Sequence, residues 1–324
     1  MEENTEQRVD LTLFSEKIQE LKDRIASVIV GQEQTVDLVL TAILANGHVL
    51  IEGVPGVAKT LLARLTARLI DADFSRIQFT PDLMPSDVLG TTVFNMKTNG
   101  FDFHQGPIFA DIVLVDEINR APAKTQAALF EVMEERQISI DGTTHRMGDL
   151  YTILATQNPV EQEGTYKLPE AQLDRFLMKI TMDYPSLEEE VNILERHHTN
   201  AALVKLEDVT PVLTKEELLS LRALMSRVFV DRTLLQYIAL IVQQTRTSKA
   251  VYLGASPRAS VAMLQSSKAY ALLQGRDFVT PEDIKFVAPY VLQHRLILTA
   301  EAEMEGYSPV KVTQRLIDKV EVPK

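Results

Sequence analysis

The stretch HVLIEGVPGVAKTLLARLTARLI, residues 48–70, decides the fold class of this chain. Residues 48–52 are a short apolar run, which predicts a buried strand. The glycine-rich segment 53–60 follows, and apolar residues at helical spacing then continue to about Ile70, which predicts a helix. A buried strand, a glycine-rich turn and a helix in this order are typical of a three-layer αβα protein with a parallel sheet.

The same alternation continues through the first half of the chain. Further strands are predicted, and they are separated by helices and by two hairpins that turn at Asn99-Gly100 and Asp141-Gly142. The expected strands are 74–79, 112–115, 151–155 and 178–182, the hairpins 91–105 and 137–147, and the core helices 11–29, one after Gly31, and 121–136. The pattern predicts an α/β core whose parallel sheet is covered on both faces.

No strand is predicted after Pro185, where helical periodicity takes over. The helices are expected at 186–198, 214–229, 231–246, 256–274 and 280–293. The final stretch, 301–324, is polar, and we expect it to be only partly ordered. The predicted organisation is an N-terminal helix (1–29), a core (30–185), a linker helix region (186–210) and an all-α second domain (211–324).

Composition excludes several functional classes. The 324 residues contain 33 Lys+Arg against 45 Asp+Glu, which gives a net charge of −12, and they contain no Cys. A disulfide framework, an iron–sulfur cluster, a thiolate zinc site and a Cys nucleophile are therefore excluded. Residues 38–51, the longest stretch without a charged residue, are too short for the roughly 20-residue span of a membrane helix. We expect a cytoplasmic protein without a signal peptide or a default affinity for nucleic acid.

The glycine-rich segment GVPGVAKT, residues 53–60, resembles the phosphate-binding loop G-x-x-x-x-G-K-[S/T]. Successive backbone N–H groups of such a loop and of the following helix form a cradle for phosphate. Lys59 is expected to reach the β- and γ-phosphates, and the Thr60 hydroxyl to ligate Mg²⁺. Ala58 stands where the pattern has its second glycine, which is acceptable if φ there is negative. A plain Gly/Pro turn is the alternative interpretation.

Two carboxylates end the apolar run IVLVDEINR, residues 112–120. The carboxyl ends of parallel strands are where ligands bind in doubly wound sheets. Asp116 is predicted to hold Mg²⁺, and Glu117 to orient and deprotonate the attacking water. Asn158 follows the next apolar run, YTILATQNP (151–159), where its amide could position that water. The alternatives are a solvated loop at Asp116 and a simple Asn-Pro turn at Asn158.

Two arginines are candidates for neutralising charge in a transition state. Arg175 lies in LPEAQLDRF, and Arg258 in GASPRA at the start of a predicted helix. Each also has a structural alternative. Arg175 could pair with Asp174 or Glu170, and Arg258 could form a cap or a salt bridge.

Five segments together resemble the MoxR family of AAA+ ATPases over about residues 30–290. They are GVPGVAKT, FTPDLMPSDVLG, LVDEINRAPAKTQAALFEVMEERQ, ATQNPVEQEGTYKLPEAQLDRFL and GASPRA. The resemblance implies an ATPase core with a helical lid. It implies a nucleotide loop of Gly53, Val54, Pro55, Gly56, Val57, Ala58, Lys59, Thr60 and Leu61.

The resemblance also assigns roles to the remaining candidates. Asp116 and Glu117 match Walker B, and Asn158 matches sensor 1. Arg175 matches the arginine finger, and Arg258 matches sensor 2, which in the wider clade acts in cis or on a neighbouring subunit. Gly31 matches the place where such ATPases contact adenine.

Family membership implies ATP and Mg²⁺ as cofactors and a homo-oligomer, typically a hexameric ring. It implies a chaperone-like remodeller of protein complexes, often paired with a von Willebrand factor A domain protein and active in assembly or metal-cofactor insertion. One alternative is a nucleic-acid motor like the MCM helicases, whose hairpins these resemble, although the hairpins carry only Lys97 and Arg146 as bases. The other is a scaffold that binds ATP without useful turnover.

Overall fold

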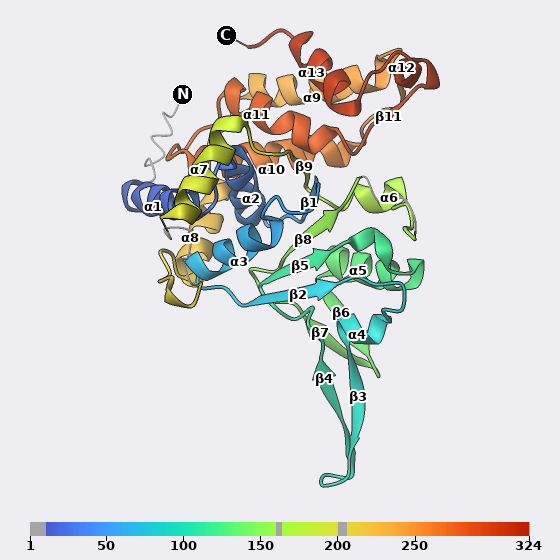
Figure 1. Cartoon of the computed structure of the whole chain (residues 1–324). Coiled ribbons are helices and arrows are strands. Elements are labelled where there is room, and N and C mark those ends of the chain that lie inside the picture. The colour runs from blue at the N-terminus through green and yellow to red at the C-terminus, as the bar shows by residue number, and fades with distance from the viewer. Residues whose placement is uncertain (1–10, 160–163, 200–205, 324) are drawn as a thin grey trace, which may run out of the picture.

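A five-stranded parallel sheet lies at the centre of the computed structural model, which describes residues 11–159, 164–199 and 206–323 (Figure 1). Its strands are β1 (Val49–Gly53), β2 (Phe74–Gln78), β5 (Ile112–Asp116), β8 (Thr152–Gln157) and β9 (Met178–Met182). Their spatial order is β2-β5-β8-β1-β9, with every neighbouring pair parallel. All five predicted strands are therefore confirmed, with shifts of one or two residues at their ends.

The sheet is covered on both faces, and β5 shows why. All five of its residues are buried, and successive side chains point to opposite faces. Ile112 and Leu114 enter one apolar cluster, whereas Val113 and Val115 enter the other. The first face is covered by α1 (Thr12–Val28), α2 (Glu33–Leu44) and α3 (Lys59–Leu69), the second by α4 (Pro85–Leu89) and α5 (Ala123–Glu135). This is the predicted α/β three-layer class.

Both predicted hairpins are present. The longer one joins β3 (Gly90–Asn95) to β4 (Gly100–Gln105) and projects away from the sheet (Figure 1). The shorter one joins β6 (Gln137–Ile140) to β7 (Thr143–Arg146). Their turn residues Asn99, Asp141 and Gly142 have positive φ, which is the conformation that these residue types favour.

The second half of the chain forms the helical lid. Figure 1 shows α9, α11 and α13 grouped beyond the β1–β9 side of the sheet. The short helix α6 (Glu170–Leu173) lies between β8 and β9, and the helices after the sheet are α7 (Leu187–His198), α8 (Lys215–Leu224), α9 (Arg232–Thr247), α10 (Pro257–Leu273), α11 (Pro281–Leu292), α12 (Ala300–Met304) and α13 (Pro309–Asp318). Short 3₁₀ turns lie at Ile118–Arg120, Leu206–Asp208 and Met225–Arg227. Among the described residues, no helix is long and apolar enough to cross a bilayer.

Two expectations about the lid are corrected. A small antiparallel ribbon joins β10 (Val251–Leu253) to β11 (Ile297–Leu298), although no strand was predicted after Pro185. Strands this short contain too few residues to show a period of two. The segment after residue 301 is folded through α13, because Val312, Leu316 and Ile317 form a buried stripe at helical spacing. The average polarity of this segment concealed that stripe.

Candidate functional site

The glycine-rich loop connects the carboxyl end of β1 to the first turn of α3, as predicted. Pro55 and Gly56 at its tip are exposed, whereas Val57 is buried. The Lys59 Nζ donates a hydrogen bond to the Gly53 carbonyl at 2.7 Å. The predicted nucleotide residues thus form one continuous turn between the two elements: Gly53, Val54, Pro55, Gly56, Val57, Ala58, Lys59, Thr60 and Leu61.

The start of α3 suits an anion. Its first turn carries Lys59 and no acidic side chain. A cation beside the positive end of a helix is unfavourable unless an anion offsets it. The N–H groups of this turn are the ones that an α-helix leaves without intrahelical partners. The loop therefore has the donors and the charge that a phosphate group requires.

Ala58 has a left-handed backbone, with φ of 62°. From the sequence, alanine is expected to be acceptable at this position if φ is negative. That condition is not met, because φ is positive. The Cβ of a non-glycine residue makes this conformation unfavourable by roughly 1–2 kcal/mol. The loop keeps this conformation despite its cost, as strained residues at ligand-binding sites often do.

Strand order brings the predicted motifs together. In the sheet β8 lies between β5 and β1, so Asn158, just after β8, lies between the carboxylates that end β5 and the loop that follows β1. The carboxyl ends of parallel strands share one edge of the sheet, where ligands bind in α/β proteins. Residues that are distant in sequence therefore meet at one edge.

Asp116 is only 7% exposed, and its carboxylate uses both of its oxygens. Oδ1 accepts a hydrogen bond from the Thr156 hydroxyl at 3.0 Å, and Oδ2 accepts one from Arg76 Nε at 2.6 Å. Each carboxylate oxygen has two lone pairs, so acceptor capacity remains for a cation. These partners fix the orientation of the carboxylate on β5.

Glu117 is held from three directions. Its backbone N–H donates to Thr156 Oγ1 at 3.0 Å, and its Oε2 accepts from Gln78 Nε2 at 2.9 Å. Arg120 Nε lies 3.1 Å from the same oxygen. Glu117 also has a left-handed backbone, with φ of 56°, which turns it out of line with β5. This second strained residue lies at the same edge as Ala58.

Sequence reasoning missed Arg76, Gln78 and Thr156. Arg76 and Gln78 alternate on β2, whose register places Gln78 directly beside Asp116. Residues two positions apart in a strand lie on the same face, so the sequence could have shown that Arg76 and Gln78 share a face of the predicted strand. Which strand lies next to that face depends on strand order, which no local pattern contains.

The two candidate arginines converge on one carboxylate, that of Glu134 on α5. Arg175 Nη1 lies 3.3 Å from Oε2 of Glu134, and Arg258 Nη2 lies 3.0 Å from Oε1. Arg175 also donates to the Phe130 carbonyl at 2.9 Å. The suggested pairing of Arg175 with Asp174 or Glu170 is not what the structure has. Arg175 from the core and Arg258 from the lid therefore lie close together, each paired with one oxygen of Glu134.

Gly31 lies at the start of the core with φ of 73°. A Cβ built on it would fall 2.3 Å from the carboxylate of Glu189, which lies in the first turn of α7. The positive φ favours glycine, and a larger residue would have to displace the end of the Glu189 side chain. The backbone at Gly31 is therefore packed directly against the start of the linker helix.

The residues present could hold Mg²⁺ only together with other ligands. No group of three or more His, Cys, Asp or Glu suited to a metal occurs in the parts of the chain that are described. Mg²⁺ is typically bound by one or two protein oxygens together with water and substrate phosphates. A Thr60 hydroxyl and an Asp116 carboxylate are a donor set of that kind.

Family models match the two halves of the chain separately. The ATPase family associated with various cellular activities (AAA) matches residues 48–178, and the AAA lid domain matches residues 243–318. The first match spans the sheet from β1 into β9, and the second spans the helices from α9 to α13. The fold and the site define a AAA ATPase with a helical lid.

Full-length relatives place the chain more narrowly. Chaperone MoxR1 of Mycobacterium tuberculosis is 45% identical, over 93% of this chain and 81% of its own. Protein MoxR of Methylorubrum extorquens is 31% identical over 91% of each chain, and YeaC of Bacillus subtilis is 48% identical over 93% of each. The crystal structure of a Cytophaga hutchinsonii protein, described as an ATPase, superposes on this chain with a TM-score of 0.89. The two are 41% identical, and the superposition covers 97% of each chain. The chain belongs to the MoxR family of AAA+ ATPases.

Proposed function

We propose that this ATPase hydrolyses Mg²⁺-bound ATP at the edge of the sheet formed by the ends of β1, β5 and β8. The observation that carries the proposal is the strand order, which puts an anion-binding loop after β1 and an ordered carboxylate pair at the end of β5, on either side of β8. Lys59 binds the β- and γ-phosphates there, and the backbone at Gly31 approaches the adenine. Thr60 and Asp116 hold Mg²⁺, which supplies Lewis-acid stabilisation of charge on the phosphates.

Glu117 is the proposed general base, with Asn158 orienting the attacking water. Its Oε2 is occupied by Gln78 and Arg120 in this structure. A carboxylate has two oxygens with two lone pairs each, so Glu117 keeps acceptor capacity for a proton from water while these contacts hold it. Gln78 and Arg120 therefore set the position from which Glu117 acts.

Arg175 and Arg258 are the proposed cations for the γ-phosphate, with the core (30–185) supplying the first and the lid (211–324) the second. Both are held by Glu134 in the single chain. A hexameric ring would let Arg175 reach the nucleotide of a neighbouring subunit, as the family resemblance implies. Arg258 would act in cis or in trans.

The cellular role that we propose is remodelling or assembly of protein complexes in the cytoplasm. Its support is the name of the relative MoxR1, which is called a chaperone. Insertion of a metal cofactor into a client, together with a von Willebrand factor A domain protein, is the form of this role that the family resemblance implies.

Two substitutions test the hydrolytic site. Lys59→Ala should lower ATP turnover by about 100-fold or more, because electrostatic stabilisation of the phosphates is lost. Glu117→Gln should retain binding of a fluorescent ATP analogue and lose phosphate release, because only the base is removed. Wild-type phosphate release by Glu117→Gln would contradict the assigned base, and the absence of release by the unaltered protein would favour the scaffold alternative.

A further inference from the structure

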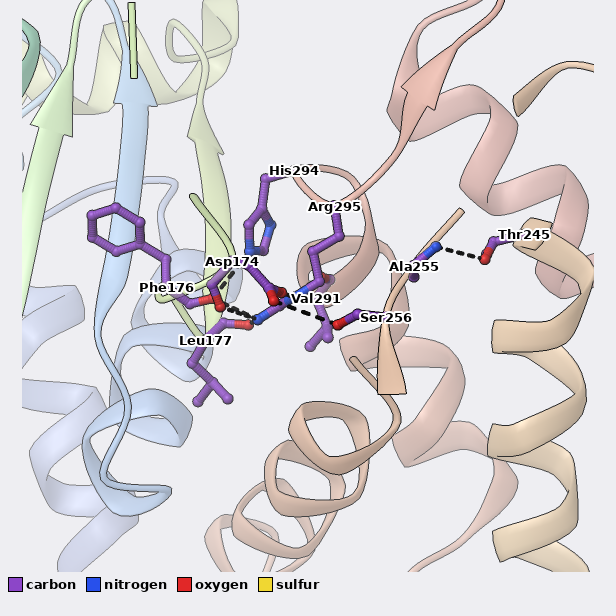
Figure 2. Close-up of polar contacts among 9 residues, drawn as sticks. All are labelled: Asp174, Phe176, Leu177, Thr245, Ala255, Ser256, Val291, His294 and Arg295. Atoms are coloured by element: carbon purple, nitrogen blue, oxygen red, sulfur yellow. Dashed lines mark hydrogen bonds and ion pairs between the residues drawn. The ribbon is translucent and has the colours of Figure 1, made fainter. Parts of the chain in front are cut away.

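Arg295 lies just after α11 and joins the lid to the core. All the N–H groups of its guanidinium donate hydrogen bonds. Its side chain is 4% exposed, and its Nε pairs with Asp174 Oδ1 at 2.7 Å. Nη2 donates to the carbonyls of Asp174 and Phe176 at 3.2 and 2.7 Å. Nη1 donates to the carbonyl of Leu177 at 3.2 Å and to that of Val291 (Figure 2). Each of the five N–H groups of the guanidinium thus has one acceptor.

The acceptors lie on both sides of the boundary between core and lid. Val291 belongs to α11, whereas Asp174, Phe176 and Leu177 form the segment that leads into β9. The two residues before Arg295 reinforce the junction, since Gln293 Nε2 donates to the Lys179 carbonyl and His294 Nε2 donates to that of Phe176. Three consecutive side chains therefore attach the end of α11 to one stretch of core backbone.

The same junction bears on both candidate arginines. Arg175 is the residue between Asp174, which pairs with Arg295, and Phe176, whose carbonyl Arg295 binds. The other oxygen of Asp174 accepts from the hydroxyl of Ser256, the N-cap of α10, at 3.4 Å (Figure 2). Arg258 lies two residues further, in the first turn of α10. The backbone thus links both arginines to the Asp174–Arg295 pair. Arg175 directly follows Asp174, and Arg258 is two residues after Ser256, which donates to Asp174.

We propose that Arg295 is a positioning residue that sets Arg175 and Arg258 as one unit, so that core and lid present both cations together. The inference rests on the proposed role of these two arginines in ATP hydrolysis. A lysine cannot replace Arg295, because an ammonium group has three donors and no planar fork. Two of the five acceptors would then lose their partner within a buried junction.

Arg276 supplies a matched control. It forms an ion pair with buried Asp283 in the first turn of α11, at 2.5 Å, and both residues lie within the lid. Arg276→Met removes a comparable arginine–aspartate pair at the start of α11, whereas Arg295 lies just after the end of that helix, and the pair involves no core residue. Comparison of Arg295→Lys and Arg295→Met with Arg276→Met therefore separates positioning from general loss of lid stability.

The first readout is steady-state ATP hydrolysis. We expect Arg295→Lys and Arg295→Met to lower kcat by about 10- to 100-fold, as small displacements of catalytic groups do. KM for ATP should change by less than about threefold, because the phosphate loop on β1 is untouched. Arg276→Met should retain kcat within about twofold. Equal loss of kcat in the Arg276 and Arg295 variants would overturn the proposal.

The second readout needs no turnover. The chain has no Cys, so spin labels can be placed specifically at Lys124→Cys on α5 and Gln265→Cys on α10, both exposed positions. Pulsed electron resonance should give one narrow label-to-label distance in the otherwise unaltered chain and in Arg276→Met, and a broadened or displaced one in Arg295→Lys. An unchanged distance would overturn the proposal even if ATP turnover failed, whereas failure of Lys59→Ala to lower turnover would overturn only the proposed catalytic site. If Arg295→Met does not fold, Arg295→Lys and Asp174→Asn provide the same test.

Discussion

At the scale of single residues, the site depends on side chains and backbones in costly states. Ala58 and Glu117 both have left-handed backbones at the ligand edge of the sheet. Each costs roughly 1–3 kcal/mol, which the surrounding structure must offset. His48 differs from these two residues, because the free energy needed to keep its ring neutral and buried depends on pH.

His48 is buried, with 4% of its surface exposed, and directly precedes β1. Its Nε2 donates to the Met133 carbonyl at 3.1 Å, and its Nδ1 accepts from the Ile153 N–H at 3.0 Å. Nδ1 must therefore be unprotonated, and the ring neutral. Burial, together with the positive charge of Arg136, lowers the pKa of His48 from 6.5 to about 3. Burial also holds the pKa of His294 well below its usual value.

We expect acid to destabilise the fold through His48. Between pH 6.5 and about 3 the unfolded imidazole binds a proton that the folded one does not, so the free energy of unfolding falls as pH falls. Between pH 6 and 5, the unaltered chain should lose about 1 kcal/mol more stability than His48→Asn, measured by urea denaturation. The exposed His198→Asn serves as control and should follow the unaltered chain. The same pH dependence in His48→Asn would refute this assignment.

At the scale of elements, the two hairpins behave as one unit at their bases and diverge at the longer tip. Phe103 on β4 lies 4.4 Å from His145 on β7 and 5.9 Å from Phe109, measured between ring centroids. Phe101, two residues toward the tip on the same strand, is 73% exposed and contacts Phe94 at 5.3 Å. Two phenylalanines of one strand thus have different structural roles.

Substitution of these two residues should separate the roles. Phe103→Ala should cost about 1–2 kcal/mol of unfolding free energy, because it removes a half-buried ring between the hairpins. Phe101→Ala should change stability by less than about 0.5 kcal/mol, because its ring is largely in water already. Urea denaturation of both variants measures the difference. Equal costs would show that the tip packs as firmly as the base.

At the scale of the whole molecule, the site depends on how distant segments are brought together. Strand order unites the nucleotide loop with the carboxylate pair. Glu134 joins Arg175 of the core to Arg258 of the lid. In a ring, these arginines would exchange Glu134 for a phosphate group, and this requirement gives a test of action between subunits.

Mixing two inactive variants should restore hydrolysis if Arg175 acts in trans. Arg175→Ala retains an intact phosphate loop, and Lys59→Ala retains its arginine. A mixed ring therefore contains interfaces with both, and phosphate release should rise well above that of either variant alone. The specific activity of the unaltered chain should also increase with protein concentration. The double variant Lys59→Ala/Arg175→Ala, mixed with Arg175→Ala, is the control and should stay inactive. If the chain is a monomer and mixing the two variants gives no increase in phosphate release, action of Arg175 in trans is refuted.

Much of the fold could be predicted because it is encoded locally. The short strands, the turns at Asn99 and Asp141 and the helical periodicity of the lid depend on residues close together in the chain. The elements that escaped prediction were either too short to show a period, as β10 is, or mixed with polar residues, as α13 is. The site motifs were local too, since the phosphate loop and the residues Asp116-Glu117 each directly follow one strand.

The sequence by itself determined the class of fold, the family and the identity of the candidate catalytic residues. Tertiary structure alone decided their partners: Arg76 on Asp116, Gln78 on Glu117, Glu134 between two arginines and Arg295 across the boundary of core and lid. The physical reason is the range of the interactions. Periodicity and turn chemistry act over a few residues, whereas a hydrogen bond or an ion pair forms only after strand order and helix packing have brought distant atoms within about 3 Å.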